Sequence, residues 1–326
     1  RLTDVTGVQT CALPIWPESM LTREPVAITG IGMICPLGIA ARECWERMIQ
    51  GVSGIQRITR FESSGCETCI GGSLPEDYLV LEKERTPKRL FKQTIRVTRL
   101  LRICAQDALA DSGVDRASID PRRAAVIFGT SGGSVRAPED LGDKDVERFR
   151  IIREMPNASA AWVSIDCGFR GPSYVVSAAS ASGAIAVVKS MELIASGFAD
   201  LVLTGGADIL LSRNSLRRGN LFQLLSRRNH DPKGASRPFD GQRDGWVLSD
   251  GGCVLVLESR THALSRGAPV YAWLRGCGFG SSPYRAFAPR RFQGAMAKTM
   301  GMALSNAAIP ASSVEVICAR DRKSVV

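Results

Sequence analysis

Ser180 lies in a turn whose residue types suit nucleophilic chemistry. The stretch GPSYVVSAASASGAIAV, residues 171–187, predicts a strand over 173–178 that turns sharply through small residues into a helix from 181. A side chain at the start of a helix lies where backbone N–H groups favour negative charge. Ser180 could therefore be a nucleophile, a substitute for a different nucleophile, or only a small residue that allows the turn to close.

The other glycine- and cysteine-containing segments do not complete a known cofactor motif. Cys35 stands where a dinucleotide fingerprint G-x-G-x-x-G needs its third glycine. The glycine-rich loop after Phe128 lacks the Gly-Lys-Ser/Thr of a phosphate-binding loop. Cys167, upstream of the turn, is expected to be a core residue rather than a relocated nucleophile. We therefore expect no bound cofactor.

The cysteines and histidines do not form a convincing metal-binding pattern. Cys66 and Cys69 are closely spaced, but a structural zinc site needs further ligands and the chain has only two histidines, His230 and His262. We therefore expect no metal site. Ten cysteines scattered through the chain are typical of a reduced, cytoplasmic protein.

The formal charge of +10 points to a basic surface, with arginine pairs such as Arg217-Arg218 and Arg227-Arg228. Solvated side chains explain such a surface, and the functional alternative is an acidic partner. The sequence shows no helix-turn-helix, zinc-finger or aromatic RNA-binding signature, so we expect no nucleic acid partner. We also expect no membrane partner, because no run of about 18 apolar residues is present.

Both ends of the chain look foreign. The stretches VTGVQTCALPI, residues 5–15, and DRKSVV, residues 321–326, resemble translated sequencing adapters. We expect residues 1–19 to be a non-native or unstructured leader and residues 321–326 a non-native tail. Met20 is then the expected natural start.

The elements that would position the turn alternate between strand and helix. The strands are apolar throughout, which is typical of a sheet covered on both faces. The helix over 40–50 has Trp45, Met48 and Ile49 as its apolar stripe, and the helical region after Pro87 ends at Gly113, with its basic residues on an exposed face. The expected strands lie at 26–29, 124–128, 173–178, 200–208, 252–257 and 314–319, the last after a helix at 292–307.

Several stretches resemble, in order, motifs of the β-ketoacyl synthase family, the condensing enzymes of fatty-acid and polyketide synthesis. The stretch that contains Trp246 departs from its family motif, because Trp246 stands in place of the usual phenylalanine. The stretch FKQTIRVTRL further resembles the aromatic-polyketide branch, which includes chain-length-factor subunits. The family motifs are VAITGIGMICPLG, WERMIQGVSGIQRITRF, GPSYVVSAASASGA, LVLTGGAD and ASRPFDGQRDGWV.

This resemblance implies an α/β chain with a thiolase-like, five-layer α-β-α-β-α sandwich built from two similar halves. Residues 20–262 would be a complete N-terminal half, and residues 263–320 the start of a truncated C-terminal half. The family usually forms dimers, so we expect a homodimer or a heterodimer with another ketosynthase subunit. The acidic partner implied is an acyl carrier protein.

The family has cysteine at the position of Ser180, where it accepts an acyl chain from a carrier thioester. Its two catalytic histidines are not matched by His230 or His262, and alignment places Arg320 at the first. The positive end of the helix stabilises a negative charge by up to ~2 kcal/mol, which lowers a pKa by about 1.5 units. This brings a thiol of pKa ~8.5 close to neutrality, but it is too small to ionise a hydroxyl. Ser180 would therefore need a separate base to act as nucleophile.

Three functions remain open from the sequence. The first is a β-ketoacyl synthase that acts on carrier-tethered acyl groups through Ser180. The alternative is a catalytically silent, chain-length-factor-like subunit that supports an active ketosynthase. The outside alternative is a basic RNA-binding protein.

Overall fold

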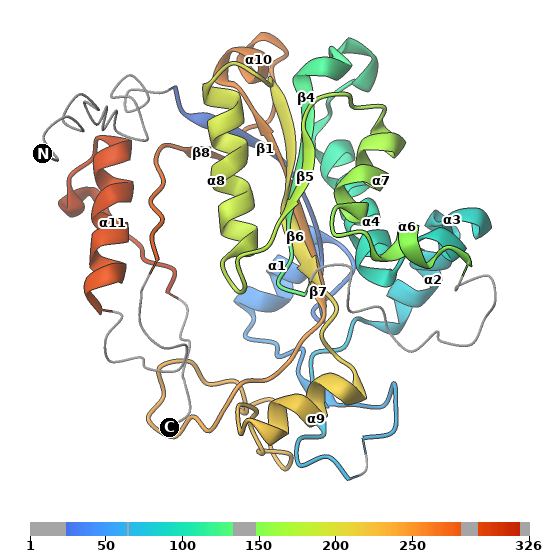
Figure 1. The fold of residues 1–326 in the computed structure, drawn as a ribbon. Helices are drawn as coiled ribbons and strands as arrows, with labels where there is room; N and C mark the ends of the chain where they lie inside the picture. The colour runs from blue at the N-terminus through green and yellow to red at the C-terminus, as the bar shows by residue number, and fades with distance from the viewer. Residues whose placement is uncertain (1–23, 64, 133–147, 282–292, 320–326) are drawn as a thin grey trace, which may run out of the picture.

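The computed structural model describes residues 24–63, 65–132, 148–281 and 293–319 (Figure 1). The expected leader at 1–19, the expected start at Met20, Arg320 and the expected tail at 321–326 lie outside the described residues. Within the described part, no helix is both long enough and apolar enough to cross a membrane.

A six-stranded mixed sheet with strand order β5-β4-β6-β7-β1-β8 forms the centre of the fold. β4 pairs in parallel with β5 and β6, whereas β7 runs antiparallel to both β6 and β1. β1, β4, β5 and β6 therefore point the same way. The strands are β1 (Val26–Ile34), β4 (Ala124–Gly129), β5 (Ser173–Val176), β6 (Leu201–Asp208), β7 (Gly251–Glu258) and β8 (Ala272–Leu274), with β2 (Gln56–Arg57) and β3 (Ile70–Gly71) in a separate pair.

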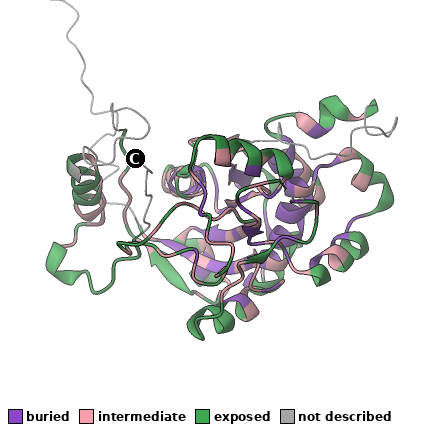
Figure 2. Cartoon of the chain, turned by 90° about the horizontal axis from the view of Figure 1, so that it is seen from below, coloured by how far each residue is buried: buried purple, intermediate pink, exposed green. Residues whose placement is uncertain are grey.

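Helices cover both faces of the sheet, as the apolar strands predict (Figure 1). α4 and α7 pack on one face and α8 on the other, and each face has its own apolar core. Figure 2 shows the buried residues gathered in the sheet and on the helix sides that face it. The helices are α1 (Ala41–Ile49), α2 (Glu76–Arg85), α3 (Lys88–Gln93), α4 (Arg96–Ser112), α6 (Arg150–Glu154), α7 (Ala158–Cys167), α8 (Ser182–Ala195), α9 (Arg213–Leu221), α10 (Arg260–Ser265) and α11 (Gln293–Ala307).

The long helical region after Pro87 is two helices rather than one. Thr94 and Ile95 are extended, and the hydroxyl of Thr94 donates to the carbonyl of Leu90 at 2.6 Å, which closes α3. The break allows Ile95 to bury its side chain against the core. α4 ends as predicted, because Gly113 follows it with φ of 62°, a left-handed conformation that glycine adopts without strain.

Two predictions about helix faces are wrong. The stripe of Trp45, Met48 and Ile49 on α1 is exposed, at 57%, 50% and 63%, and only Cys44 of this helix is buried. On α4, Arg99 and Arg102 are buried although they are basic. Both helices differ from the prediction because their neighbours, and not their periodicity, decide which side is covered.

The buried arginines of α4 are neutralised by carboxylates from two other helices. Nε of Arg99 donates to Oε1 of Glu82 on α2 at 2.8 Å, and both side chains are almost fully buried. Arg102 pairs with Asp166 on α7. Buried charges persist only when paired in this way.

The strand predicted at 314–319 is absent from the structure as described. Residues 314–319 form no ladder with any described strand, and Val316 and Ile317 are exposed, at 82% and 66%. An apolar run becomes a strand only where a neighbouring strand satisfies its backbone groups. The predicted boundary after residue 262 stays a prediction.

Candidate functional site

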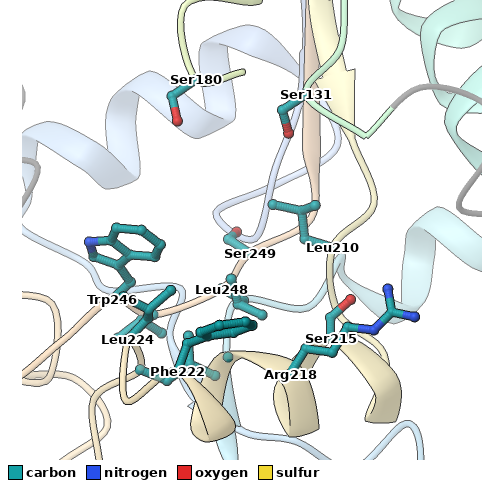
Figure 3. Close-up of a pocket in the computed structure, with 13 residues that line it drawn as sticks. Ser131, Ser180, Leu210, Ser215, Arg218, Phe222, Leu224, Trp246, Leu248 and Ser249 are labelled. Atoms are coloured by element: carbon teal, nitrogen blue, oxygen red, sulfur yellow. The ribbon is translucent and has the colours of Figure 1, made fainter. Parts of the chain in front are cut away.

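Ser180 lies on a strained turn between β5 and α8. Ala179, immediately before it, has φ of 49°, which is uncommon for a residue with a side chain. Such strain persists only where the surrounding structure holds the residue in place, and it is more common at functional sites. The side chain of Ser180 is exposed, and Figure 3 shows its hydroxyl on the rim of a cavity.

Hydrogen bonds within the turn hold this geometry. The backbone N–H of Ala178 donates to Oγ of Ser182 at 2.9 Å, and that hydroxyl donates to the carbonyl of Ala179 at 2.6 Å. The N–H of Ala181 donates to the carbonyl of Ala178 at 3.1 Å. Ser182 is the first residue of α8, so the turn presents Ser180 at the positive end of this helix.

Gly129 at the end of β4 allows the start of α8 to lie close to the sheet. A methyl group at Gly129 would lie 2.3 Å from the carbonyl carbon of Ser182. We therefore expect Gly129→Ala to destabilise the fold by about 1–3 kcal/mol, measured by urea unfolding. Gly183→Ala is the matched control, because a methyl group at Gly183 meets nothing within 4 Å. Equal stability of the two variants would contradict the close-packing explanation.

Asp208 at the end of β6 organises the loop that follows β4. Its carboxylate accepts hydrogen bonds from the hydroxyls of Thr130, at 2.8 Å, and Ser131, at 2.7 Å. It also accepts from the N–H groups of Ser131 and Gly132, at 3.1 and 3.2 Å. Sequence reasoning missed both Asp208 and Ser131. The available signal was a polar residue at the carboxyl end of a buried strand, where ligand crevices form in α/β sheets.

A cavity of about 570 Å³ opens below Ser180 and Ser131. Figure 3 shows these two serines at one end, with Trp246, Phe222 and Leu224 on the opposite side. Trp246 is held by backbone pairing, because its N–H donates to the carbonyl of Leu224 at 2.8 Å. The remaining lining residues are Leu210, Ser215, Arg218, Gly219, Leu225, Val247, Leu248 and Ser249.

A second cavity of about 520 Å³ borders Ser180 from the ends of the strands. Cys35 and Cys253 lie in its wall. Burial raises the pKa of Cys253 to about 11, so its thiol is a poor nucleophile at neutral pH. Burial also raises the pKa of Cys167 to about 11, and Cys167 packs against the core, as predicted.

Neither histidine lies at this site. His262 on α10 contacts the carboxylate of Glu258 at the far end of β7, whereas Gly251, where β7 begins, borders the second cavity. The strand spans roughly 23 Å at ~3.3 Å per residue. His230 lies exposed in the loop between α9 and β7. Of the described residues, no histidine lines either cavity beside Ser180.

The carboxylates among the described lining residues are Asp208 and Asp250, and both are engaged. Asp250 is buried, accepts hydrogen bonds from the N–H groups of Leu210 and Leu211, and pairs with Arg60 at 3.1 Å. Burial raises the pKa of Asp250 above the ordinary aspartate value. Asp208 or Asp250 could therefore act as a base for Ser180 only after losing the hydrogen bonds and ion pair described above. Otherwise the base must come from outside the described lining.

No group of three or more histidine, cysteine or carboxylate side chains is placed to hold a metal ion among the described residues. Near the Cys66 and Cys69 pair, Sγ of Cys69 lies 3.3 Å from the carbonyl oxygen of Cys66 and 3.6 Å from that of Ser63.

The family model described as "Beta-ketoacyl synthase, N-terminal domain" matches residues 23–263. The chain belongs to this family. A curated relative is the chloroplastic 3-oxoacyl-[acyl-carrier-protein] synthase II of Arabidopsis thaliana, 31% identical over 315 residues. The match covers 92% of this chain and 58% of the relative, so the chain spans less than two thirds of that protein.

Solved structures show the same fold. A β-ketoacyl synthase from Burkholderia phymatum STM815 superposes with a TM-score of 0.74 at 30% identity, covering 89% of this chain and 72% of that one. A type II polyketide ketosynthase solved with its acyl-carrier protein gives a TM-score of 0.74 at 26% identity, covering 90% and 72%. The thiolase-like α/β fold predicted from the ketosynthase motifs is confirmed, and the described residues supply one helix–sheet–helix unit of it.

Proposed function

We propose that this chain acts on acyl groups tethered to an acyl carrier protein in fatty-acid or polyketide synthesis. The observation that carries the proposal is the position of Ser180, on a strained turn at the start of α8 and on the rim of a largely apolar cavity. A cavity of this kind accommodates an acyl chain. The relatives support the same substrate class, because one is a 3-oxoacyl-[acyl-carrier-protein] synthase and another is a ketosynthase in complex with its acyl-carrier protein.

In the proposed step, the hydroxyl oxygen of Ser180 attacks the carbonyl carbon of the thioester. The new bond is a serine ester, the C–S bond breaks, and the proton leaves on the carrier thiol. The positive end of α8 favours the negative charge that develops on the carbonyl oxygen. The hydroxyl still requires a base to activate it.

A second candidate is a partner subunit that supports an active ketosynthase without forming an acyl-enzyme. The absence of a histidine from the described lining of both cavities favours it. Under this proposal the chain pairs with a cysteine-bearing ketosynthase subunit, whereas the enzyme proposal also allows a homodimer. Residues 20–262 as one ketosynthase half and 263–320 as the start of another remain part of the proposal.

Incubation with acyl-loaded carrier protein, followed by intact-mass and peptide mass spectrometry, tests the two candidates. An acyl group on Ser180, absent from Ser180→Ala, is the result expected for the enzyme. Absence of the adduct, with condensation restored only by a cysteine-bearing partner, would support the subunit. Salt-sensitive RNA binding without affinity for carrier protein would overturn both.

A further inference from the structure

One wall of the Ser180 cavity carries a positive charge. Ser215 and Arg218 of α9 line this cavity together, because residues spaced three or four apart share one face of a helix, and Phe222, the residue that follows α9, lines it too. Figure 3 shows Arg218 and Ser215 at the end of the cavity away from Ser180. Arg218 and Ser215 therefore lie in a part of the cavity that the far end of an acyl chain attached at Ser180 could enter.

Among the residues that the structure describes, none balances the charge of Arg218. The described lining of the cavity contains no carboxylate, and α9 contains no acidic residue. No described carboxylate forms an ion pair with Arg218. This differs from the arginines of α4, which are each paired with a carboxylate. Arg218 is exposed and lines the cavity, so its guanidinium can accept an incoming anion.

Arg217, the next residue, does not share this position. It lines a separate cavity of about 630 Å³ with Arg213 and Asn220, on another side of α9. The two arginines therefore have the same charge and the same helix but face different spaces. This makes Arg217 a matched control for Arg218.

The Ser180 cavity carries serine hydroxyls in addition to the guanidinium of Arg218. Ser215 lies beside Arg218, and Ser131 and Ser249 also line the cavity. A plain hydrocarbon chain would cover Arg218 without replacing the water that it loses, which costs free energy. A carboxylate would instead form charge-assisted hydrogen bonds with the guanidinium.

We propose that the Ser180 cavity selects acyl chains that end in a carboxylate, and that Arg218 binds this carboxylate. The inference rests on the proposed function, since it names the substrate class for the same site. Trp246, Phe222 and Leu224 bind the methylene part of the chain, and Arg218 with Ser215 binds its end.

The test measures binding and not acyl transfer. The ligands are two pantetheine amides that cannot acylate Ser180, one carrying a hexanoyl group and one the adipoyl group with its terminal carboxylate. Calorimetry on the unmodified chain should show at least about 10-fold tighter binding of the adipoyl ligand. Arg218→Gln should remove this preference, while Arg217→Gln should retain it, with thermal unfolding confirming that both variants are folded.

The contrary outcomes are distinct. Equal affinity for the two ligands, no binding of either, or loss of the preference in Arg217→Gln would each overturn the inference. A second pair of ligands carries the phosphate of phosphopantetheine. If Arg218→Gln weakens this pair equally for both acyl groups and leaves the pantetheine pair unchanged, Arg218 binds the carrier-arm phosphate and the inference is wrong. Failure of Ser180 to become acylated leaves the binding preference intact, so the two proposals fail separately.

Discussion

Replacing Ser180 with cysteine is expected to raise the rate of acylation at this position by at least about 100-fold. A positioned general base contributes about 10²–10⁴-fold, and no described histidine lines the cavities beside Ser180 to act as one. A thiol needs less help, because a few per cent is already thiolate at neutral pH and the start of α8 favours that charge. The turn accepts cysteine, since the side chain of Ser180 is exposed.

Single-turnover acylation by acyl-loaded carrier protein, followed by mass spectrometry, measures this effect. The rate of Ser180→Cys should rise with pH as the thiolate forms, and Ser180→Ala should show no adduct at any pH. Cys167 provides an internal control, because its raised pKa keeps it unreactive in all three proteins. Equal rates for serine and cysteine would show that Ser180 already has a base.

The turn and five of the six expected strands could be predicted because their signals are local. β4 is buried along its whole length, and its unbroken apolar run already indicates a strand covered on both faces. The small residues around Ser180 indicate a close approach of helix and sheet, which Gly129 and Ser182 make in the structure. In both cases a stretch of a few residues carries the signal, although distant segments complete the packing.

The remaining features depend on residues far apart in the chain. Arg99 is basic and reads as exposed, yet Glu82 on another helix permits its burial. Asp208 becomes a site residue only because β4 and β6 are neighbours, which brings the loop at Ser131 within reach of its carboxylate. Arg217 and Arg218 are equivalent in sequence, and only the fold separates the two cavities that they face.

Glu258 is expected to be the most sensitive charged residue for stability. Its side chain is fully buried at the end of β7, where it accepts hydrogen bonds from Thr29 of β1, His262 of α10 and Arg266. Burial alone would raise the pKa of this carboxyl, but the hydrogen bonds from Arg266, His262 and Thr29 outweigh it and lower the pKa to about 2. A drop from 4.5 to about 2 corresponds to roughly 3 kcal/mol of stability.

Glu258→Gln should therefore lower the free energy of unfolding by about 3 kcal/mol at neutral pH. The folded state holds the carboxylate more strongly than the unfolded state does, so the unfolded state binds more protons between these pKa values. The contribution of Glu258 is thus fully present above pH 4.5 and is lost as the pH falls toward about 2. The difference in stability between the unmodified chain and Glu258→Gln should shrink across this range.

Urea unfolding followed by circular dichroism, from pH 7 down to the acid limit of the folded state, measures both effects. Glu46→Gln is the matched control, because Glu46 and its partner Arg42 are exposed, at 52% and 91%, and such a pair contributes about 0–1 kcal/mol. A loss of similar size in both variants would contradict the role of the buried network. The role of the network would also be contradicted if the difference in free energy of unfolding between the unmodified chain and Glu258→Gln stayed constant from pH 7 to pH 3. Protonation of the Glu258 carboxylate should reduce this difference over that range.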